Sequence, residues 1–366
     1  MAPDPNFPGL LKEELDTPAL LVDLDLMESN ILRMARFMYG TSARLRPHYK
    51  THKTPAIARK QAEAGAIGIT CAKVEEAETL VNAGIRDILI ANQVVGPKKI
   101  ARLAGLARHA DLMVAVDDAR NVDDLSTGMV AAGARLRVLV EVNVGNNRCG
   151  VEPGEAAVRL AHHVAEAPGL VFAGLMGYEG FCQRIQDLAE RERMARGAMA
   201  KLIATRDMVE AAGLEVGIVS GGGTGTHAIV STFLGVTEVQ AGTYVVMDTD
   251  YRDLGIDFGC ALTLLATVIS RPNPETAILD VGLKGITIDH GIPELIGVPG
   301  GRITRLSEEH AKVELSDPAV KLVPGDKVEI IPSHACTTIS LHDTLYGIRN
   351  GRLEVVWPVA GRGKFK

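Results

Sequence analysis

The sequence predicts an α/β fold: a (β/α)8 barrel followed by a small all-β domain that also takes up the first strand of the chain. Between about residues 20 and 242, short apolar segments rich in Val, Ile and Leu alternate with stretches of helical periodicity. After about residue 251 the helical periodicity ends and short β-rich segments follow. The chain has 366 residues, enough for about two domains at ~150 residues per domain.

Nine apolar segments in the first part have the length and composition of strands. They are residues 20–25, 45–50, 68–71, 87–91, 112–117, 136–143, 171–178, 216–220 and 236–241. Helical stretches lie between them, for example at 56–64, 74–83 and 100–107. Alternating strands and helices form a parallel sheet with helical crossovers. A closed barrel needs eight strands, so we expect segment 20–25 to belong to another sheet.

Six more strands are predicted in the last part of the chain. They are residues 262–269, 277–281, 312–315, 327–331, 345–348 and 353–356. Turn signals such as Pro-Gly-Asp at 324–326 separate them. This pattern is typical of a small all-β domain, whose sheet segment 20–25 joins. We therefore expect a barrel domain at 27–250 and a β domain formed by 1–26 and 251–366.

Composition excludes several classes of function. The chain has 39 Lys and Arg against 45 Asp and Glu, a net charge of −6, and no basic block to bind nucleic acid. No apolar run approaches the ~18 residues of a membrane helix, and the first 16 residues lack the basic start and apolar middle of a signal peptide. The five cysteines are scattered, which does not indicate a disulfide framework. We expect a cytoplasmic protein without a nucleic-acid or membrane partner.

Lys50 ends the first predicted barrel strand. The active sites of such barrels lie at the carboxyl ends of the strands, so its amine should point into the mouth of the barrel. Apolar walls and neighbouring cations would lower the pKa of that amine and make it a usable nucleophile. A single lysine at a strand end is more often merely solvated, so a second feature is needed.

The second feature is a glycine loop, Ser-Gly-Gly-Gly-Thr-Gly-Thr at residues 220–226, which follows the seventh barrel strand. It offers closely spaced N–H groups and hydroxyls, which suits a phosphate. The eighth strand ends in Gly242-Thr243-Tyr244, and phosphate sites in these barrels favour the loops after strands 7 and 8. A tight turn explains the glycines equally well. Together with Lys50, the two loops favour pyridoxal phosphate bound to the lysine.

His334 and Cys336 are two residues apart in a segment expected to be a strand, where alternate residues share a face. They could hold one metal and leave positions for water or a substrate oxygen, as catalytic sites require. A packed thiol beside a surface histidine is the alternative, and the spacing alone favours it. Arg148 and Tyr178 each lie at or just after a strand end, where each either contacts a cofactor or has a structural role.

Taken together, these motifs resemble the fold-type III pyridoxal-phosphate enzymes. That family comprises D-threonine aldolase, D-threo-3-hydroxyaspartate aldolase and dehydratase, and eukaryotic-type D-serine dehydratase. The resemblance runs nearly end to end. It lies in residues 16–25, 46–53, 145–151, 220–225, 240–251, 334–336 and 356–363.

The resemblance implies a role for each candidate residue. Lys50 would carry pyridoxal phosphate, Arg148 would lie near its phenolic oxygen and Tyr178 beside its ring. The residues around its phosphate would be Gly222, Gly223, Thr224, Gly242, Thr243 and Tyr244. His334 and Cys336 would hold a divalent metal (manganese, zinc or magnesium) near the β-hydroxyl of the substrate. The family is homodimeric, which implies active sites at the subunit interface.

The implied activity is that of a carbon–carbon lyase. Retro-aldol cleavage of a D-3-hydroxy amino acid of the D-threonine type would give glycine and an aldehyde, with His52 or a metal-activated water as the base on the β-hydroxyl. The glycine loop looks like that of the aldolase branch, as does Leu-His-Asp at 341–343.

Two alternatives stay open. The pair His334 and Cys336 is similar to that of the dehydratases, and a thiolate prefers zinc to manganese or magnesium. A dehydratase acting on D-serine or D-threo-3-hydroxyaspartate would be a carbon–oxygen lyase that gives a 2-oxo acid and ammonia. A non-catalytic carrier of pyridoxal phosphate is more distant, because such proteins lack a β domain like residues 251–366.

Overall fold

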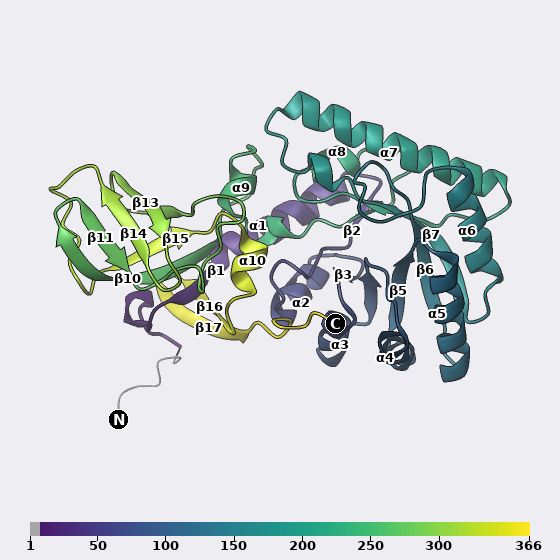
Figure 1. The fold of residues 1–366 in the computed structure, drawn as a ribbon, viewed down its shortest axis with the longest axis horizontal. Helices are drawn as coiled ribbons and strands as arrows, with labels where there is room; N and C mark the ends of the chain where they lie inside the picture. The colour runs from purple at the N-terminus through teal and green to yellow at the C-terminus, as the bar shows by residue number, and fades with distance from the viewer. Residues whose placement is uncertain (1–7) are drawn as a thin grey trace. The chain divides into compact units, whose positions relative to one another are not determined.

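The computed structural model describes residues 8–366, which form two compact units (Figure 1). The barrel unit comprises Met34–Lys50, Pro55–Gly242 and Gly363–Lys366, and the β unit comprises residues 8–33 with Thr51–Thr54 and Thr243–Arg362. The domain boundaries expected after residues 26 and 250 stay a prediction. Within residues 8–366 there is no helix that is both long and apolar enough to cross a membrane.

Eight strands of the barrel unit form one parallel sheet. They are β2 (Arg44–Leu45), β3 (Ile69–Cys71), β4 (Asp87–Ile90), β5 (Asp111–Val116), β6 (Leu136–Glu141), β7 (Leu170–Gly177), β8 (Ile218–Gly221) and β9 (Glu238–Val239). Their order in the sheet is β2-β9-β8-β7-β6-β5-β4-β3. The two ends meet: the N–H of Tyr49 donates to the carbonyl of Thr70 (2.7 Å) and that of Thr70 to Pro47 (2.9 Å). The predicted barrel is confirmed.

Helices follow most of the barrel strands (Figure 1). They are α2 (Pro55–Glu63), α3 (Val74–Asn82), α4 (Pro97–Ala107), α5 (Ala119–Ala132), α6 (Glu155–Glu166), α7 (Leu188–Ala211) and α8 (His227–Val230), with α1 (Leu24–Tyr39) before them. Their ends follow the local sequence: in α5 the side chain of Asp118 caps the first turn, and Gly133 ends the helix at a φ of 60°. Helix α4 buries Ile100, Leu103 and Ala104, which lie on one face.

A buried guanidinium lies where the ends of the sheet meet. Arg46 follows β2 and donates two hydrogen bonds to Glu238 of β9, at 2.9 and 3.0 Å, and one to Asp87 of β4, at 2.6 Å. The residue before β3 is Gly68, where a Cβ would lie 2.1 Å from Arg46 Nη1. Only glycine therefore leaves room for this side chain.

The β unit holds a nine-stranded sheet. Its strands are β1 (Ala19–Asp23), β10 (Leu262–Asn273), β11 (Thr276–Leu279), β12 (Glu294–Ile296), β13 (Gly301–Leu306), β14 (Ala311–Leu315), β15 (Lys327–Ile331), β16 (Thr344–Arg349) and β17 (Arg352–Pro358). Strand β1 pairs with β10 antiparallel and with β16 parallel, so the expectation that segment 20–25 joins this sheet is confirmed. Strands β12 and β13 were not predicted, because β12 is three residues long and largely exposed and β13 opens with a glycine.

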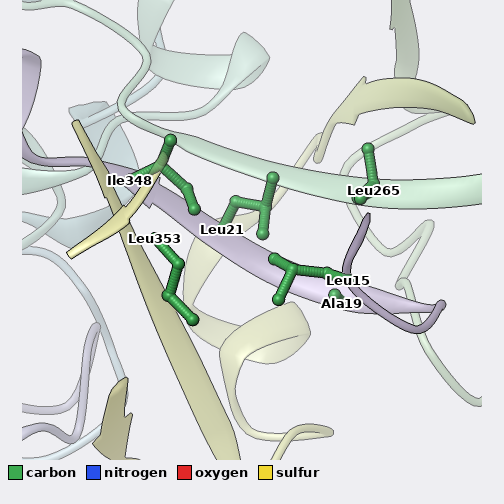
Figure 2. Close-up of a cluster of buried hydrophobic side chains, with 6 residues drawn as sticks. All are labelled: Leu15, Ala19, Leu21, Leu265, Ile348 and Leu353. Atoms are coloured by element: carbon green, nitrogen blue, oxygen red, sulfur yellow. The ribbon is translucent and has the colours of Figure 1, made fainter. Parts of the chain in front are cut away.

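Figure 2 shows the apolar cluster that packs around β1. It consists of Leu15, Ala19, Leu21, Leu265, Ile348 and Leu353. These residues come from β1 and the segment before it, from β10, and from the hairpin of β16 and β17. The cluster therefore joins segments from both ends of the chain.

Replacing Leu21 by alanine should lower the free energy of unfolding by about 2–5 kcal/mol, because the side chain is 2% exposed and would leave a cavity in this cluster. Denaturant unfolding followed by the fluorescence of Trp357, the single tryptophan, measures this. Leu32→Ala is the control, since Leu32 is 50% exposed and should change stability by less than about 0.5 kcal/mol. Equal midpoints for the two variants would contradict the assigned core.

Candidate active site

Three of the residues expected around the cofactor lie together in the barrel unit. The Lys50 Nζ is 5.8 Å from the centre of the Tyr178 ring, and the Arg148 Cζ is 5.6 Å from it. Tyr178 directly follows β7, while Lys50 and Arg148 are exposed. Two cations at one aromatic ring create a place for a flat anionic group. Pyridoxal phosphate is such a group, so these residues fit it.

The sequence had suggested that Lys50 ends a strand, and this prediction is wrong. Strand β2 stops at Leu45, and Pro47 lacks the N–H that would continue the ladder. His48 makes an isolated bridge with Thr70, and Lys50 then lies in a turn, where its N–H donates to His48 Nδ1 at 3.3 Å.

The loop that carries Arg148 is held by its own polar side chains. Asn143 Oδ1 accepts hydrogen bonds from the N–H groups of Gly145 (3.2 Å) and Asn147 (3.1 Å). Asp117, next after β5, accepts one from Gly150 at 2.9 Å. These hydrogen bonds hold the backbone around Arg148 in place, although the Arg148 side chain is exposed.

The glycine loop follows β8 and differs from expectation, because three of its N–H groups donate to neighbouring side chains. Gly222 donates to Glu179 Oε2 (3.1 Å), Gly223 to Thr226 Oγ1 (3.2 Å) and Gly225 to Gln183 Oε1 (3.0 Å). A Cβ at Gly223 would lie 2.6 Å from Gln183 Oε1, and one at Gly225 would lie 1.9 Å from its carbonyl. The close approach of Gln183 is thus one physical reason for these glycines, and their role at a phosphate stays a prediction.

The phosphate residues expected from the sequence fall in both units. Thr224 and Gly242 belong to the barrel unit, as do Gly222 and Gly223, whereas Thr243 and Tyr244 belong to the β unit. The Tyr244 ring is fully buried, 5.5 Å from that of Phe258. The hydroxyl of Thr243 lies 3.9 Å from Cys336 Sγ.

His334 and Cys336 lie in the β unit, but on a helix start and not on a strand. His334 is the N-cap of α10 (Ala335–Ile339), so the two side chains meet across the first turn. They hydrogen bond with each other, and Cys336 Sγ also lies 3.3 Å from Thr51 Oγ1. The expected strand is wrong, but the expected proximity of imidazole and thiol is found.

Asp289 and His290 complete a polar cluster that the sequence had not indicated. His334 Nδ1 lies 2.7 Å from Asp289 Oδ2, and the rings of His334 and His290 stack at 3.7 Å and 5°. Ligand atoms of Asp289, His290 and His334 all lie within 4.8 Å of one another. Because imidazole lone pairs lie in the ring plane, two parallel stacked rings do not both point at one ion, and Cys336 is the better partner for His334.

The electrostatics of this cluster favour a cation. Burial raises the pKa of the Asp289 carboxyl, but its hydrogen bonds with His334 and Thr337 outweigh that effect and lower the pKa to about 2. Burial lowers the pKa of the His334 imidazole, and Cys336 and Asp289 raise it to about 9. Imidazole and thiolate are zinc ligands, and a carboxylate on the other ring nitrogen is the usual support of a metal-binding histidine. The donor set fits a divalent metal.

His52 and His290 are the imidazoles that bear on proton transfer. His52 is fully buried and its Nδ1 accepts the N–H of Thr54 at 3.2 Å, so its proton resides on Nε2 and the ring is a donor there. His290 Nδ1 lies 2.9 Å from Asp250 Oδ2, within ion-pair distance. The role of base expected for His52 stays a prediction.

Asp248 fixes the start of α10. Its buried carboxylate accepts the N–H of Ala335 at 2.9 Å and that of Tyr251 at 3.1 Å. Burial raises its pKa to about 6. Since Ala335 lies between His334 and Cys336, this bond sets the backbone of both candidate ligands.

Two family models match the chain. "Alanine racemase, N-terminal domain" matches residues 22–250 and "Putative serine dehydratase domain" matches residues 261–348. A D-threonine aldolase from Arthrobacter sp. is 40% identical, over 99% of this chain and 96% of its own. A 3-hydroxy-D-aspartate aldolase from Paracoccus denitrificans is 38% identical, over 98% and 95%. The crystal structure of a D-threonine aldolase from Filomicrobium marinum has a TM-score of 0.97 and 42% identity, over 99% and 100%.

Asp248→Ala should weaken the binding of Zn²⁺ or Mn²⁺ to the β unit by about 10–100-fold, because α10 loses the acceptor that fixes its first N–H. Titration with metal and a chromophoric chelator measures the affinity. Asp253→Ala, on the same segment but exposed, is the control and should bind metal as the native chain does. An unchanged affinity in Asp248→Ala would show that this bond does not support the ligands.

Proposed function

The chain belongs to the D-threonine aldolase and D-serine dehydratase-like family of alanine racemase-like enzymes, and from this premise we propose that it cleaves D-3-hydroxy amino acids of the D-threonine type into glycine and an aldehyde. The observation that carries the proposal is the similarity to two aldolases over nearly the whole length of each chain. The proposal includes pyridoxal phosphate and a divalent metal as cofactors. It also includes a homodimer with active sites at the subunit interface, which the family resemblance supports, and a cytoplasmic location, which the composition of the chain supports.

Pyridoxal phosphate would be carried by Lys50. When bound, it withdraws electrons from the α-carbon of the amino acid, which is what breaking the Cα–Cβ bond requires. Arg148 would hold an anionic oxygen of the ring system, and Tyr178 would pack beside the ring. The position of the Tyr178 ring supports both roles, because its centre lies 5.8 Å from Lys50 Nζ and 5.6 Å from Arg148 Cζ. The glycine loop with Gly242, Thr243 and Tyr244 would bind the phosphate.

The metal would be held by His334 and Cys336, with Asp289 orienting the imidazole. A divalent ion there would lower the pKa of the substrate's β-hydroxyl. The thiol favours zinc over manganese and magnesium. Thr51, which belongs to the same unit, hydrogen bonds with Cys336.

The β-hydroxyl must lose its proton as the Cα–Cβ bond breaks. With Nδ1 occupied by the Thr54 N–H, His52 can donate a hydrogen bond from Nε2 to an oxygen that becomes negative. His290 would be a second group able to exchange a proton, since its Nδ1 lies 2.9 Å from the carboxylate of Asp250. Both residues belong to the β unit.

A dehydratase is the second candidate function. The match of residues 261–348 to the serine dehydratase model favours it, as does the imidazole–thiol pair. In that reaction Lys50 would remove the α-proton and the β-hydroxyl would leave, so the carbon skeleton stays whole. The two functions therefore differ in their products.

With pyridoxal phosphate and Zn²⁺ or Mn²⁺, the protein should convert D-threonine into glycine and acetaldehyde in equal amounts. Amino-acid analysis and an aldehyde assay measure them, with L-threonine as the control that should give neither. Formation of 2-oxobutanoate and ammonia in their place would identify the dehydratase. Binding of the cofactor with no turnover of D-threonine, D-serine or 3-hydroxyaspartate would identify a carrier.

Substitutions should separate the two cofactors. Lys50→Ala should lose both turnover and the visible absorbance of bound pyridoxal phosphate, because the amine that carries the cofactor is gone. Cys336→Ala should keep the absorbance and lose at least about tenfold in turnover and in metal content. Lys60→Ala, on α2, is the lysine control. A fully active Cys336→Ala protein with metal still bound would disprove the assigned ligand.

A further inference from the structure

Glu179 is a fully buried carboxyl group in the barrel unit that has no part in the chemistry above. It follows Tyr178 at the end of β7. Burial raises its pKa above the usual range of a glutamate, although its hydrogen bonds with Thr226, Gly222 and Gln183 act in the opposite direction. Burying a carboxyl group costs free energy of folding unless its oxygens accept hydrogen bonds. The partners of those hydrogen bonds therefore indicate the role of Glu179.

The bonds lead to the glycine loop, either directly or through Gln183. Oε1 accepts from Thr226 Oγ1 (2.5 Å) and Gln183 Nε2 (2.7 Å), and Oε2 accepts from the N–H of Gly222 (3.1 Å). Gln183 and Thr226 also bond to each other at 2.7 Å and accept the N–H groups of Gly225 and Gly223. The carboxylate is therefore the centre of a network that takes up three N–H groups of the loop.

The network also fixes the loop in space. Gly222 has a φ of 74°, which favours glycine, and Gly223 and Gly225 pack directly on Gln183. Glu179 accepts three hydrogen bonds, so a glutamine at this position would turn an N–H₂ group toward at least one donor. Since Tyr178 and Glu179 are consecutive, the strand end that presents the aromatic ring also holds the loop.

We propose that Glu179, together with Gln183, is a positioning residue that shapes the glycine loop to bind the phosphate of the cofactor. The inference rests on the proposed function only in taking pyridoxal phosphate as the cofactor. Glu179 contacts no phosphate itself, because its oxygens are occupied by the loop. It holds the loop from its inner side and sets the distance between the phosphate site and Tyr178.

The test compares pyridoxal 5′-phosphate with pyridoxal, which reaches Lys50 equally well but has no phosphate. Dissociation constants are measured by absorbance for the native chain, Glu179→Gln and Gln183→Ala. In both variants the affinity for pyridoxal phosphate should fall at least about tenfold, the worth of one hydrogen bond to a charged group, while that for pyridoxal changes less than about threefold. Glu76→Ala is the matched control: Glu76 is also buried and accepts a backbone N–H, at 2.8 Å from Ala72, after β3.

An equal loss for both ligands would overturn the proposal, because a merely structural role weakens them alike. So would an unchanged preference for the phosphate. Gln183→Ala keeps the carboxylate and decides the question if Glu179→Gln does not fold, which the unfolding midpoint reports. Turnover of D-threonine by the native chain is measured separately, so an absence of aldolase activity would refute the proposed function and leave the binding comparison intact.

Discussion

The rim of the barrel depends on the ion pairs that the buried guanidinium of Arg46 makes with two carboxylates. Arg46 directly follows β2 and bonds to Glu238 of β9 on one side and to Asp87 of β4 on the other, across the point where the sheet closes. Removing one partner of such a group leaves an uncompensated buried charge, at a cost of about 3–5 kcal/mol. Closure in turn brings the ends of the parallel strands to one edge, so that Lys50 and Tyr178 meet although they are far apart in sequence.

The sequence predicted most of the fold because the barrel alternates regularly. Periodicity located each barrel strand to within a few residues, and the count of nine segments identified the one that joins the β unit. The prediction was less accurate where a single residue changes the local geometry. Pro47 ends the first barrel strand early, and a helix replaces the expected strand at His334 and Cys336, since the N–H of Ala335 bonds to Asp248, 87 residues before it.

The candidate site shows the same division. Residues with a local signal, such as Lys50 and the glycine loop, were identified, whereas Glu179, Gln183, Asp289 and His290 were not. These residues matter through contacts with segments that are distant in the sequence, and the residues next to them in the sequence do not indicate those contacts. The glycines of the loop can be explained in two ways. They suit a phosphate, and the close contacts with Gln183 also require glycine at positions 223 and 225.

The central place of β1 in its sheet constrains the order in which the chain can fold. During synthesis β1 emerges long before its neighbours, because β1 ends at residue 23 whereas β10 and β16 begin only at residues 262 and 344. Both edges of this apolar strand therefore stay unpaired for more than 230 residues of synthesis, and unpaired edges are prone to association. The barrel unit can assemble from its largely local contacts in the meantime. Completion of the β sheet around β1 therefore waits for the synthesis of β16, which follows the segment that carries His334 and Cys336.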